Sequence, residues 1–282
     1  PGAPRSVELA AAEQSALKRT FLQHGKTTKK RGAPRALSFS IDELPLTTVV
    51  QPYEWFAHQD GWKAVVSALD APVDLAGWVY PGATHRHVAF HETKQEYGAG
   101  AALCAMFALI GCVSLDATTS RAGVLVIIEP DDLVQFAVAR PRMSPKRVTD
   151  AHVGGAGDAT LQVQVALRAD DLRGPAAVRA THAVLLRATA WATQQKIRVA
   201  TVSTGRFPDA TLDAYDRAAR ELPTRLIARK AKKAEDQGYF AAASALRGFV
   251  ADNLVAGRRW FGGFATARTA DKPPRYIHYY YA

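Results

Sequence analysis

Apolar residues recur along this chain at two different spacings, which together predict a mixture of helices and strands. Steps of three and four residues place apolar side chains on one helical face over residues 7–23, 208–222 and 239–256. Residues 99–115 form a continuous apolar stretch that suits either a buried helix or a pair of buried strands. Alternating or short apolar runs predict strands at 37–41, 73–80, 85–90, 124–128, 182–192 and 197–204.

Capping and turn residues complete the expected order of elements. Pro130-Asp-Asp is expected to begin a helix that runs to about Arg140, with acidic residues in its first turn. The glycines of residues 154–157 predict a flexible loop before a helix at 159–172, and Gly257 is expected to end the last helix. We therefore predict an α+β fold. It has a mixed strand and helix body (1–205) and a mainly helical C-terminal part (206–282) with an aromatic and basic tail.

Composition predicts a folded protein that binds a polyanion. The chain has 282 residues, 48% of them hydrophobic, and a net charge of +10. Such a positive balance favours nucleic acid as a partner. The longest apolar run contains glycines and is too short to span a bilayer, so we expect no membrane partner. With only Cys104 and Cys112, and no signal peptide, the sequence predicts a cytoplasmic location.

The densest positive charge lies in the segment from residue 26 to 35. No acidic residue occurs between Glu13 and Asp42, so nothing nearby in the sequence neutralises this charge. Glycine and proline within the segment predict a flexible loop that binds a phosphate backbone. A solvated charged surface is the alternative. The candidate binding residues are Lys26, Lys29, Lys30, Arg31 and Arg35.

Three further segments carry candidate nucleic-acid contacts. The first joins two predicted strands, and a simple polar hairpin end is its alternative. The second follows the 208–222 helix and is partly balanced by Glu235 and Asp236. The third places arginines beside Trp260 and Phe261, which would stack on bases or wedge strands apart, or else form a buried cap. The candidate residues are Gln194, Gln195, Lys196 and Arg198; Arg229, Lys230, Lys232 and Lys233; and Arg258 and Arg259.

Catalytic signatures are weak by comparison. His85, His87 and His91, with an acid such as Glu92, leave open a metal-dependent nuclease or hydrolase, but their spacing favours a structural or surface role. The glycines at 154–157 lack the remainder of a nucleotide-binding pattern. We therefore expect no catalytic residue, no bound metal and no cofactor.

Several segments, taken in order, resemble a known family. The chain resembles the large subunit of a type I CRISPR Cascade surveillance complex of the MYXAN subtype, and the similarity extends from about residue 21 to 264. None of these motifs is a catalytic signature, so the resemblance rests on their number and order. The segments are 21–25, 53–60, 75–82, 86–90, 191–196, and 250–254 with 258–261.

The resemblance implies a non-enzymatic DNA-recognition role. Such a subunit lies near the end of the guide RNA, inspects the protospacer-adjacent motif in target double-stranded DNA and helps to open the duplex. Its implied partners are the Cascade backbone subunits, the small subunit and a recruited helicase-nuclease. The resemblance identifies no motif-reading residue, so the candidate residues above depend on charge and loop chemistry alone. The metal-dependent hydrolase and a purely structural scaffold remain the alternatives.

Overall fold

The computed structural model divides the chain into two compact units. Residues 1–20 and 109–282 form the first unit, and residues 21–108 form the second. For the strands within 28–56 and for residues 187–200, the backbone and its pairing are described. The described residues are 9, 12–13, 16–17, 28–31, 35–41, 44–50, 53–56, 72–74, 96–117, 122–168, 178–191, 194–228, 239–268 and 275–276.

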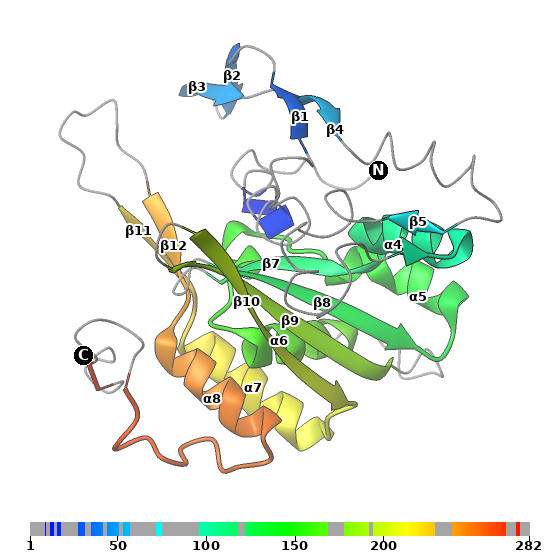
Figure 1. Cartoon of the computed structure of the whole chain (residues 1–282). Helices are drawn as coiled ribbons and strands as arrows, with labels where there is room; N and C mark the ends of the chain where they lie inside the picture. Colours follow the sequence, from blue (N-terminus) through cyan, green and yellow to red (C-terminus); the bar gives the residue numbers. More distant parts are fainter. Residues whose placement is uncertain are drawn as a thin grey trace. The chain divides into compact units, whose positions relative to one another are not determined.

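A four-stranded antiparallel sheet is the centre of the first unit (Figure 1). Its spatial order is β10-β9-β8-β7, so each strand pairs with its neighbour in sequence. This arrangement confirms the strands predicted from the apolar runs at 124–128, 182–192 and 197–204. The strands are β7 (Val113–Ala117), β8 (Ala122–Pro130), β9 (Val178–Trp191) and β10 (Gln194–Gly205).

Three helices pack together beside this sheet (Figure 1). Helix α6 (Ala156–Arg168) contacts β8, β9 and β10, and it also contacts α7 (Asp209–Glu221) and α8 (Ala245–Val255). The main apolar cluster joins valines of β7 and β8 to the sheet-facing side of α6, and a second cluster joins the three helices. The predicted helix after Pro208 is confirmed, because Leu212 and Tyr215 of its apolar stripe are buried.

The connection between β8 and α6 differs in detail from the prediction. Helix α5 (Leu133–Ala139) begins later than expected, because Pro130 still belongs to β8 and Asp132 is the N-cap. The Asp132 carboxylate accepts hydrogen bonds from two backbone N–H groups of the first turn, at 2.8 and 3.0 Å. Two short 3₁₀ turns follow, η3 (Arg140–Met143) and η4 (Val148–Ala151).

The long apolar run near residue 100 is a helix followed by a strand. Helix α4 (Ala99–Gly111) occupies most of it, and β7 follows directly. The expectation that the whole run is buried is wrong, because Phe107 is 54% exposed and Ile110 is 68% exposed. None of the described helices is both long and apolar enough to cross a membrane.

Strand pairs make up most of the described part of the second unit. Strand β1 (Thr28–Arg31) pairs with β4 (Tyr53–Phe56), and β2 (Arg35–Ile41) pairs with β3 (Leu44–Val50), all antiparallel. Two short strands, β5 (Val73–Asp74) and β6 (Glu96–Tyr97), also pair. The strand predicted at 37–41 is confirmed, whereas the 85–90 strand and most of the 73–80 strand lie outside the described residues.

Two predicted boundaries are wrong because distant segments approach closely. The predicted loop 154–157 is already helical from Ala156, and a side chain at Gly157 would meet Asp252 of α8 at 2.6 Å. The helix predicted from residue 239 begins at Ala245, because residues 239–242 form strand β12 and pair with β11 (Arg225–Ala228). Ser244 is the actual N-cap, and its hydroxyl accepts from the Arg247 N–H at 3.3 Å.

At the N-terminus, the described residues support the predicted helix. Residues 9, 12–13 and 16–17 are helical. Leu9, Ala12 and Ala16 are buried, as the predicted apolar face requires, and Leu9 and Ala12 pack with Ala151 and Val148.

Candidate nucleic-acid interface

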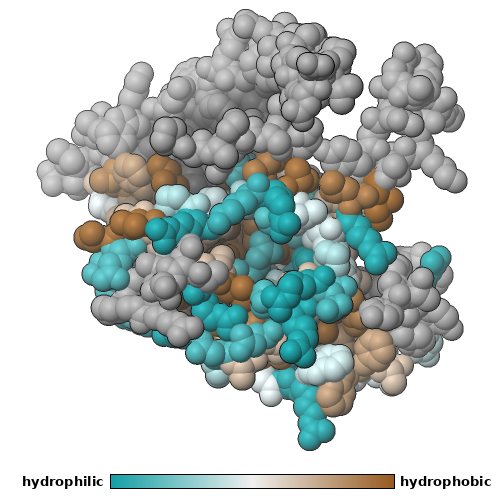
Figure 2. Space-filling model, turned by 180° about the vertical axis from the view of Figure 1, so that it is seen from behind, coloured by the Kyte–Doolittle hydropathy of each residue, from teal (hydrophilic) through white to brown (hydrophobic). Residues whose placement is uncertain are grey.

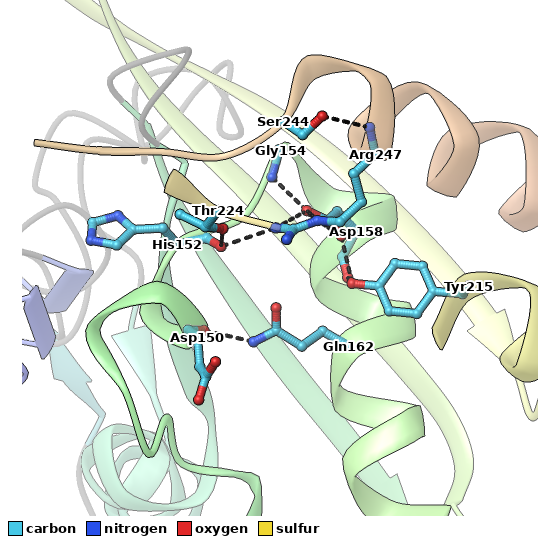
Figure 3. A network of polar contacts seen from close by, with 9 residues as sticks. All are labelled: Asp150, His152, Gly154, Asp158, Gln162, Tyr215, Thr224, Ser244 and Arg247. Carbon is cyan, nitrogen blue, oxygen red and sulfur yellow. Dashed lines mark hydrogen bonds and ion pairs between the residues drawn. The ribbon is translucent and has the colours of Figure 1, made fainter. Parts of the chain in front are cut away.

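A buried ion pair fixes α8 against α6 (Figure 3). Asp158 lies in the first turn of α6 and is fully buried, and the Arg247 guanidinium donates to its carboxylate at 2.8 to 3.0 Å. The same guanidinium donates to the backbone carbonyl of His152 at 3.2 Å, and the N–H of Gly154 donates to Asp158 at 2.7 Å. The pair therefore connects α6, α8 and the segment that precedes α6.

Tyr215 brings α7 into the same network (Figure 3). Its hydroxyl donates to the Asp158 carboxylate at 2.5 Å. Burial, and then the nearby negative charge of Asp158, raise the pKa of Tyr215 well above its ordinary value, so the hydroxyl remains a neutral donor. Burial is the largest single influence on the pKa of Arg247 and lowers it, but the charge and hydrogen bonds of Asp158, together with Tyr215 and Asp150, outweigh burial and the net shift is upward. All three helices are thus joined at one charged, fully bonded centre.

At its C-terminal end, α8 has a complete Schellman motif. Gly257 adopts a φ of +66°, and its N–H donates to the Leu254 carbonyl at 3.0 Å. The Arg258 N–H donates to the Asn253 carbonyl at 2.8 Å. This confirms the prediction that Gly257 ends the helix, since a left-handed backbone at this position favours glycine.

The buried side chain of Asn253 anchors the loop beyond this motif. Asn253 is 2% exposed, and its amide donates to the backbone carbonyls of Trp260 and Gly262 at 3.0 Å each. Phe264 packs on Phe249 of α8, with 6.2 Å between ring centroids. The backbone of residues 257–264 is therefore connected to α8 at several points, and we call this segment the anchored loop.

Cations and exposed aromatic rings occur together on the anchored loop. Trp260 is 55% exposed and Phe261 is 46% exposed, and their rings meet edge to face at 5.1 Å. Arg258 and Arg259 are exposed, and Arg258 lies within electrostatic reach of Asp252. The buried-cap alternative is wrong for these two aromatics. Arginine binds phosphate through a planar fork of N–H donors, and an exposed indole offers a face for an unpaired base.

The predicted residues at 194–198 lie in a strand rather than in a loop. Gln194, Gln195, Lys196 and Arg198 belong to β10, and Gln194 already pairs with Trp191 of β9. The two strands pair antiparallel without a register shift from Gly205 opposite Ala180 to Gln194 opposite Trp191. The polar residues therefore continue the ladder, and strand pairing determines their positions.

Strand β11 begins near the end of the sheet at which β9 is followed by β10. Thr224, which precedes β11, donates to the His152 carbonyl at 3.4 Å, and residue 152 forms a bridge with Asp116 of β7. Asp116 pairs with Gly123 of β8, and Gly123 pairs with Leu186 of β9, which directly precedes Arg187. Arg225 at the start of β11 is exposed. Arg229, Lys230, Lys232 and Lys233 lie outside the described residues.

In the second unit, the described residues of the 26–35 segment, 28–31 and 35, are strand, so the prediction of a flexible loop is wrong for these residues. Lys29, Lys30 and Arg31 lie in β1, and Arg35 begins β2. The pairing of β1 with β4 is irregular, with register shifts on both sides of Lys30. Backbone pairing with residues 53–56 explains why this glycine- and proline-flanked segment is extended. Lys26 lies outside the described residues.

No group of three or more potential metal ligands occurs among the described residues. His85, His87, His91 and Glu92 lie outside that part of the chain, so the metal hypothesis is untested by the structure.

A different kind of surface lies on α5, where three aliphatic side chains are largely exposed. Leu133, Val134 and Val138 are 74%, 77% and 60% exposed. In Figure 2, hydrophilic residues occupy much of the middle of the described surface, and hydrophobic residues gather toward its upper rim.

Sequence reasoning overlooked two residues of the candidate interface. Asn253 was not identified. It lies within a helix, and nothing in the sequence indicates that its amide binds the backbone of the loop that follows. Arg187 was also missed; it lies directly opposite Arg198 in the β9–β10 ladder. The pairing depends on the register of the two strands, which the predicted strand ranges 182–192 and 197–204 do not fix.

Comparison with known proteins supports the resemblance described above. Residues 3–106 match the family described as the DevT N-terminal domain. The chain is also 46% identical, over 286 aligned residues, to the CRISPR-associated protein Cas8a1/Csx13 of Myxococcus xanthus (strain DK1622). The alignment covers 99% of this chain and 50% of that relative, so the chain spans about half the length of the curated protein it matches. This similarity along nearly the whole chain confirms the resemblance to a Cascade large subunit of the MYXAN subtype.

Proposed function

We propose that this chain is a non-catalytic component of an RNA-guided DNA-recognition complex and that it binds nucleic acid. The observation that carries the proposal is the anchored loop, where Arg258 and Arg259 lie beside the exposed rings of Trp260 and Phe261. Asn253 and the Schellman motif already hold the backbone of the anchored loop, so the backbone loses little conformational entropy when a ligand binds. Phosphate binding by arginine and stacking of a base on Trp260 then act together.

Within such a complex, the chain binds target double-stranded DNA and the end of the guide RNA. It inspects the protospacer-adjacent motif, helps to open the duplex and contributes to recruitment of a helicase-nuclease. Guide pairing reads most of the target sequence, so the protein needs a general phosphate grip and only a few base contacts. The net charge of +10 supports binding that depends mainly on phosphate contacts.

The exposed aliphatic face of α5 supports a place among other protein subunits. Largely exposed Leu133, Val134 and Val138 lie on one short helix, and contiguous apolar surface of this kind is typical of protein interfaces. The proposed partners are the backbone and small subunits of the Cascade complex.

Direct binding measurements with variants of the anchored loop test the proposal. The assembled complex is titrated with labelled duplex DNA and labelled single-stranded DNA over a series of salt concentrations. We expect the variant R258Q/R259Q to weaken both interactions and to reduce the slope of log K against log salt by roughly one to two. We expect W260A to weaken single-strand binding by about 1–3 kcal/mol, with a smaller effect on the duplex.

The matched control is R206Q/R217Q, which likewise removes two exposed positive charges and lies far from the loop in sequence. It is expected to leave both affinities nearly unchanged. If R258Q/R259Q and the control bind alike at every salt concentration, the loop is not a nucleic-acid site. Cleavage of either probe by the complex without a helicase-nuclease would contradict the non-catalytic assignment.

A further inference from the structure

Helix α5 (Figure 1) and the 3₁₀ turn η3 form one continuous element, and its exposed side changes character along its length. On α5 the large exposed side chains are aliphatic, at Leu133, Val134 and Val138. The exposed Arg142 follows four residues after Val138, about one helical turn further on. The apolar surface is therefore followed directly by a positively charged one.

The positive charge continues beyond η3. Lys146 and Arg147 are exposed, and no acidic residue occurs between Asp132 and Asp150. The Asp150 carboxylate pairs with Arg147 at 3.2 Å and offsets part of the charge, but an exposed ion pair of this kind is weak. This end of the segment therefore remains positively charged. The surface formed by Leu133, Val134, Val138, Arg142 and Lys146 is called the α5 patch.

The element that carries the α5 patch is held firmly on its other side. Ala139 and Met143 are buried in the main apolar cluster, and Phe136 packs against the same cluster. The Arg140 guanidinium donates to the backbone carbonyl of Gly111 at 3.0 Å. Packing and hydrogen bonding thus fix the element while its aliphatic side chains stay exposed. A partner can bind such a surface without first having to order it.

The mixed character of the α5 patch favours a protein partner over nucleic acid. Phosphate groups bind cations, but unpaired bases stack on aromatic rings, and the exposed side chains of α5 are aliphatic. Aliphatic surface is stabilised when other apolar side chains cover it and exclude water. A protein segment complements the whole patch if its apolar residues lie on α5 and its carboxylates lie beside the cations.

We propose that the α5 patch binds an amphipathic segment of another subunit, which carries aliphatic residues along one side and aspartate or glutamate at one end. This inference rests on the proposed place of the chain in a multisubunit complex, and it names the chemistry of the partner. Burial of the aliphatic side chains supplies most of the affinity. Pairing of carboxylates with Arg142 and Lys146 sets the direction in which the segment runs along α5.

Photo-crosslinking within the assembled complex tests this inference. p-Benzoylphenylalanine is placed at position 134 instead of valine, the complex is irradiated, and crosslinked peptides are identified by mass spectrometry. The control has the same photoreactive residue in place of Arg217, an exposed position in α7. We expect position 134 to crosslink to a segment of another subunit that contains aliphatic residues with carboxylates beside them. The control position should not crosslink to that segment.

Charge reversal at the basic end tests the role of the cations. With the photoreactive residue at position 134, R142E/K146E should lower the crosslink yield by about tenfold at low salt, because attraction to the partner's carboxylates becomes repulsion. The matched control R206E/R217E reverses two other exposed charges and should leave the yield unchanged. Both double variants should keep the wild-type thermal midpoint, since all four arginine and lysine residues are exposed.

Several results would overturn the inference. They are a crosslink from position 134 to nucleic acid, to a second copy of this chain or to a segment without carboxylates, no crosslink to another subunit, and equal yields for the two double variants. If R258Q/R259Q weakens nucleic-acid binding but position 134 gives no such crosslink, only this inference fails. If the crosslink forms and R258Q/R259Q binds nucleic acid normally, the inference stands and the proposed nucleic-acid site fails.

Discussion

At the scale of single residues, the Asp158–Arg247 pair is the polar centre of the first unit. Asp158 is fully buried and Arg247 is 5% exposed, so neither charge is compensated by water. The carboxylate accepts from Arg247, from Tyr215 and from the N–H of Gly154, which satisfies its oxygens. Because a buried charge without a partner is costly, the pair constrains how α6, α7 and α8 meet.

Replacement of Arg247 by Met is expected to destabilise the protein strongly. The substitution leaves the Asp158 carboxylate buried without its counter-charge, which costs about 3–5 kcal/mol of unfolding free energy. Urea denaturation, followed by far-UV circular dichroism, measures the effect. Arg217→Met is the control, because that exposed arginine makes no ion pair among the described residues, and its effect should stay within about 0.5 kcal/mol. Equal midpoints for the two variants would show that the pair contributes little.

Gly154 and Gly155 provide a second comparison at this scale. A Cβ atom at Gly154 would lie 3.0 Å from the Cα of Gly248 in α8, whereas nothing lies within 4 Å of a Cβ at Gly155. We expect Gly154→Ala to destabilise the protein by about 1–3 kcal/mol, since two backbone segments must separate. Gly155→Ala should be neutral or slightly stabilising. The same denaturation experiment compares them, and a neutral Gly154→Ala would show that α8 is less closely packed than described.

At the scale of elements, local signals in the sequence were sufficient to predict helix ends at which residues close in sequence form the cap. Pro208 at the start of α7 and Gly257 at the end of α8 were both predicted correctly, because caps depend on adjacent residues. The apolar stripe of α7 and the alternation in β2 were likewise readable from spacing.

Elements that depend on distant partners were predicted less well. Residues 239–242 were expected to be helical because the apolar residues of 239–256 recur at helical spacing, but residues 239–242 form β12 and pair with β11. Strand β1 was expected to be a loop, because its pairing with β4, more than twenty residues away, leaves no local pattern. The candidate site has the same limit: Arg258 and Arg259 were identified by charge, whereas Asn253 and Arg187 depend on tertiary contacts and strand register.

Strand β1 carries the element-scale prediction for the second unit. Combined replacement of Lys29, Lys30 and Arg31 by Gln should weaken duplex binding by the assembled complex and reduce the salt slope by up to roughly three, because each lost phosphate contact removes about one counterion. Anisotropy titrations over a range of salt concentrations measure both quantities. Removing the three exposed charges of Arg206, Arg217 and Arg220 is the control. A slope that stays at the wild-type value would exclude β1 from the interface.

At the scale of the whole molecule, positive charge recurs on several different elements of the chain. The anchored loop follows α8, Lys196 and Arg198 lie in β10, and the cations of β1 belong to the second unit. Distributed contacts of this kind suit a protein that samples many DNA sites through its backbone before guide pairing begins. The similarity to a Cas8a1/Csx13 protein, at 46% identity along nearly the whole chain, is consistent with this distribution of charge.

Target binding by the complex with and without this chain tests the role of the chain in DNA recognition. Two duplex targets share the same guide-complementary sequence and differ only in the flanking motif, and binding of each is measured by gel shift at one fixed salt concentration. We predict that the complex with this chain binds the correctly flanked target more tightly than the other, and that omission of the chain abolishes the preference and weakens binding of both. Equal binding of both targets with the chain present, or an undiminished preference without it, would contradict its role in DNA recognition.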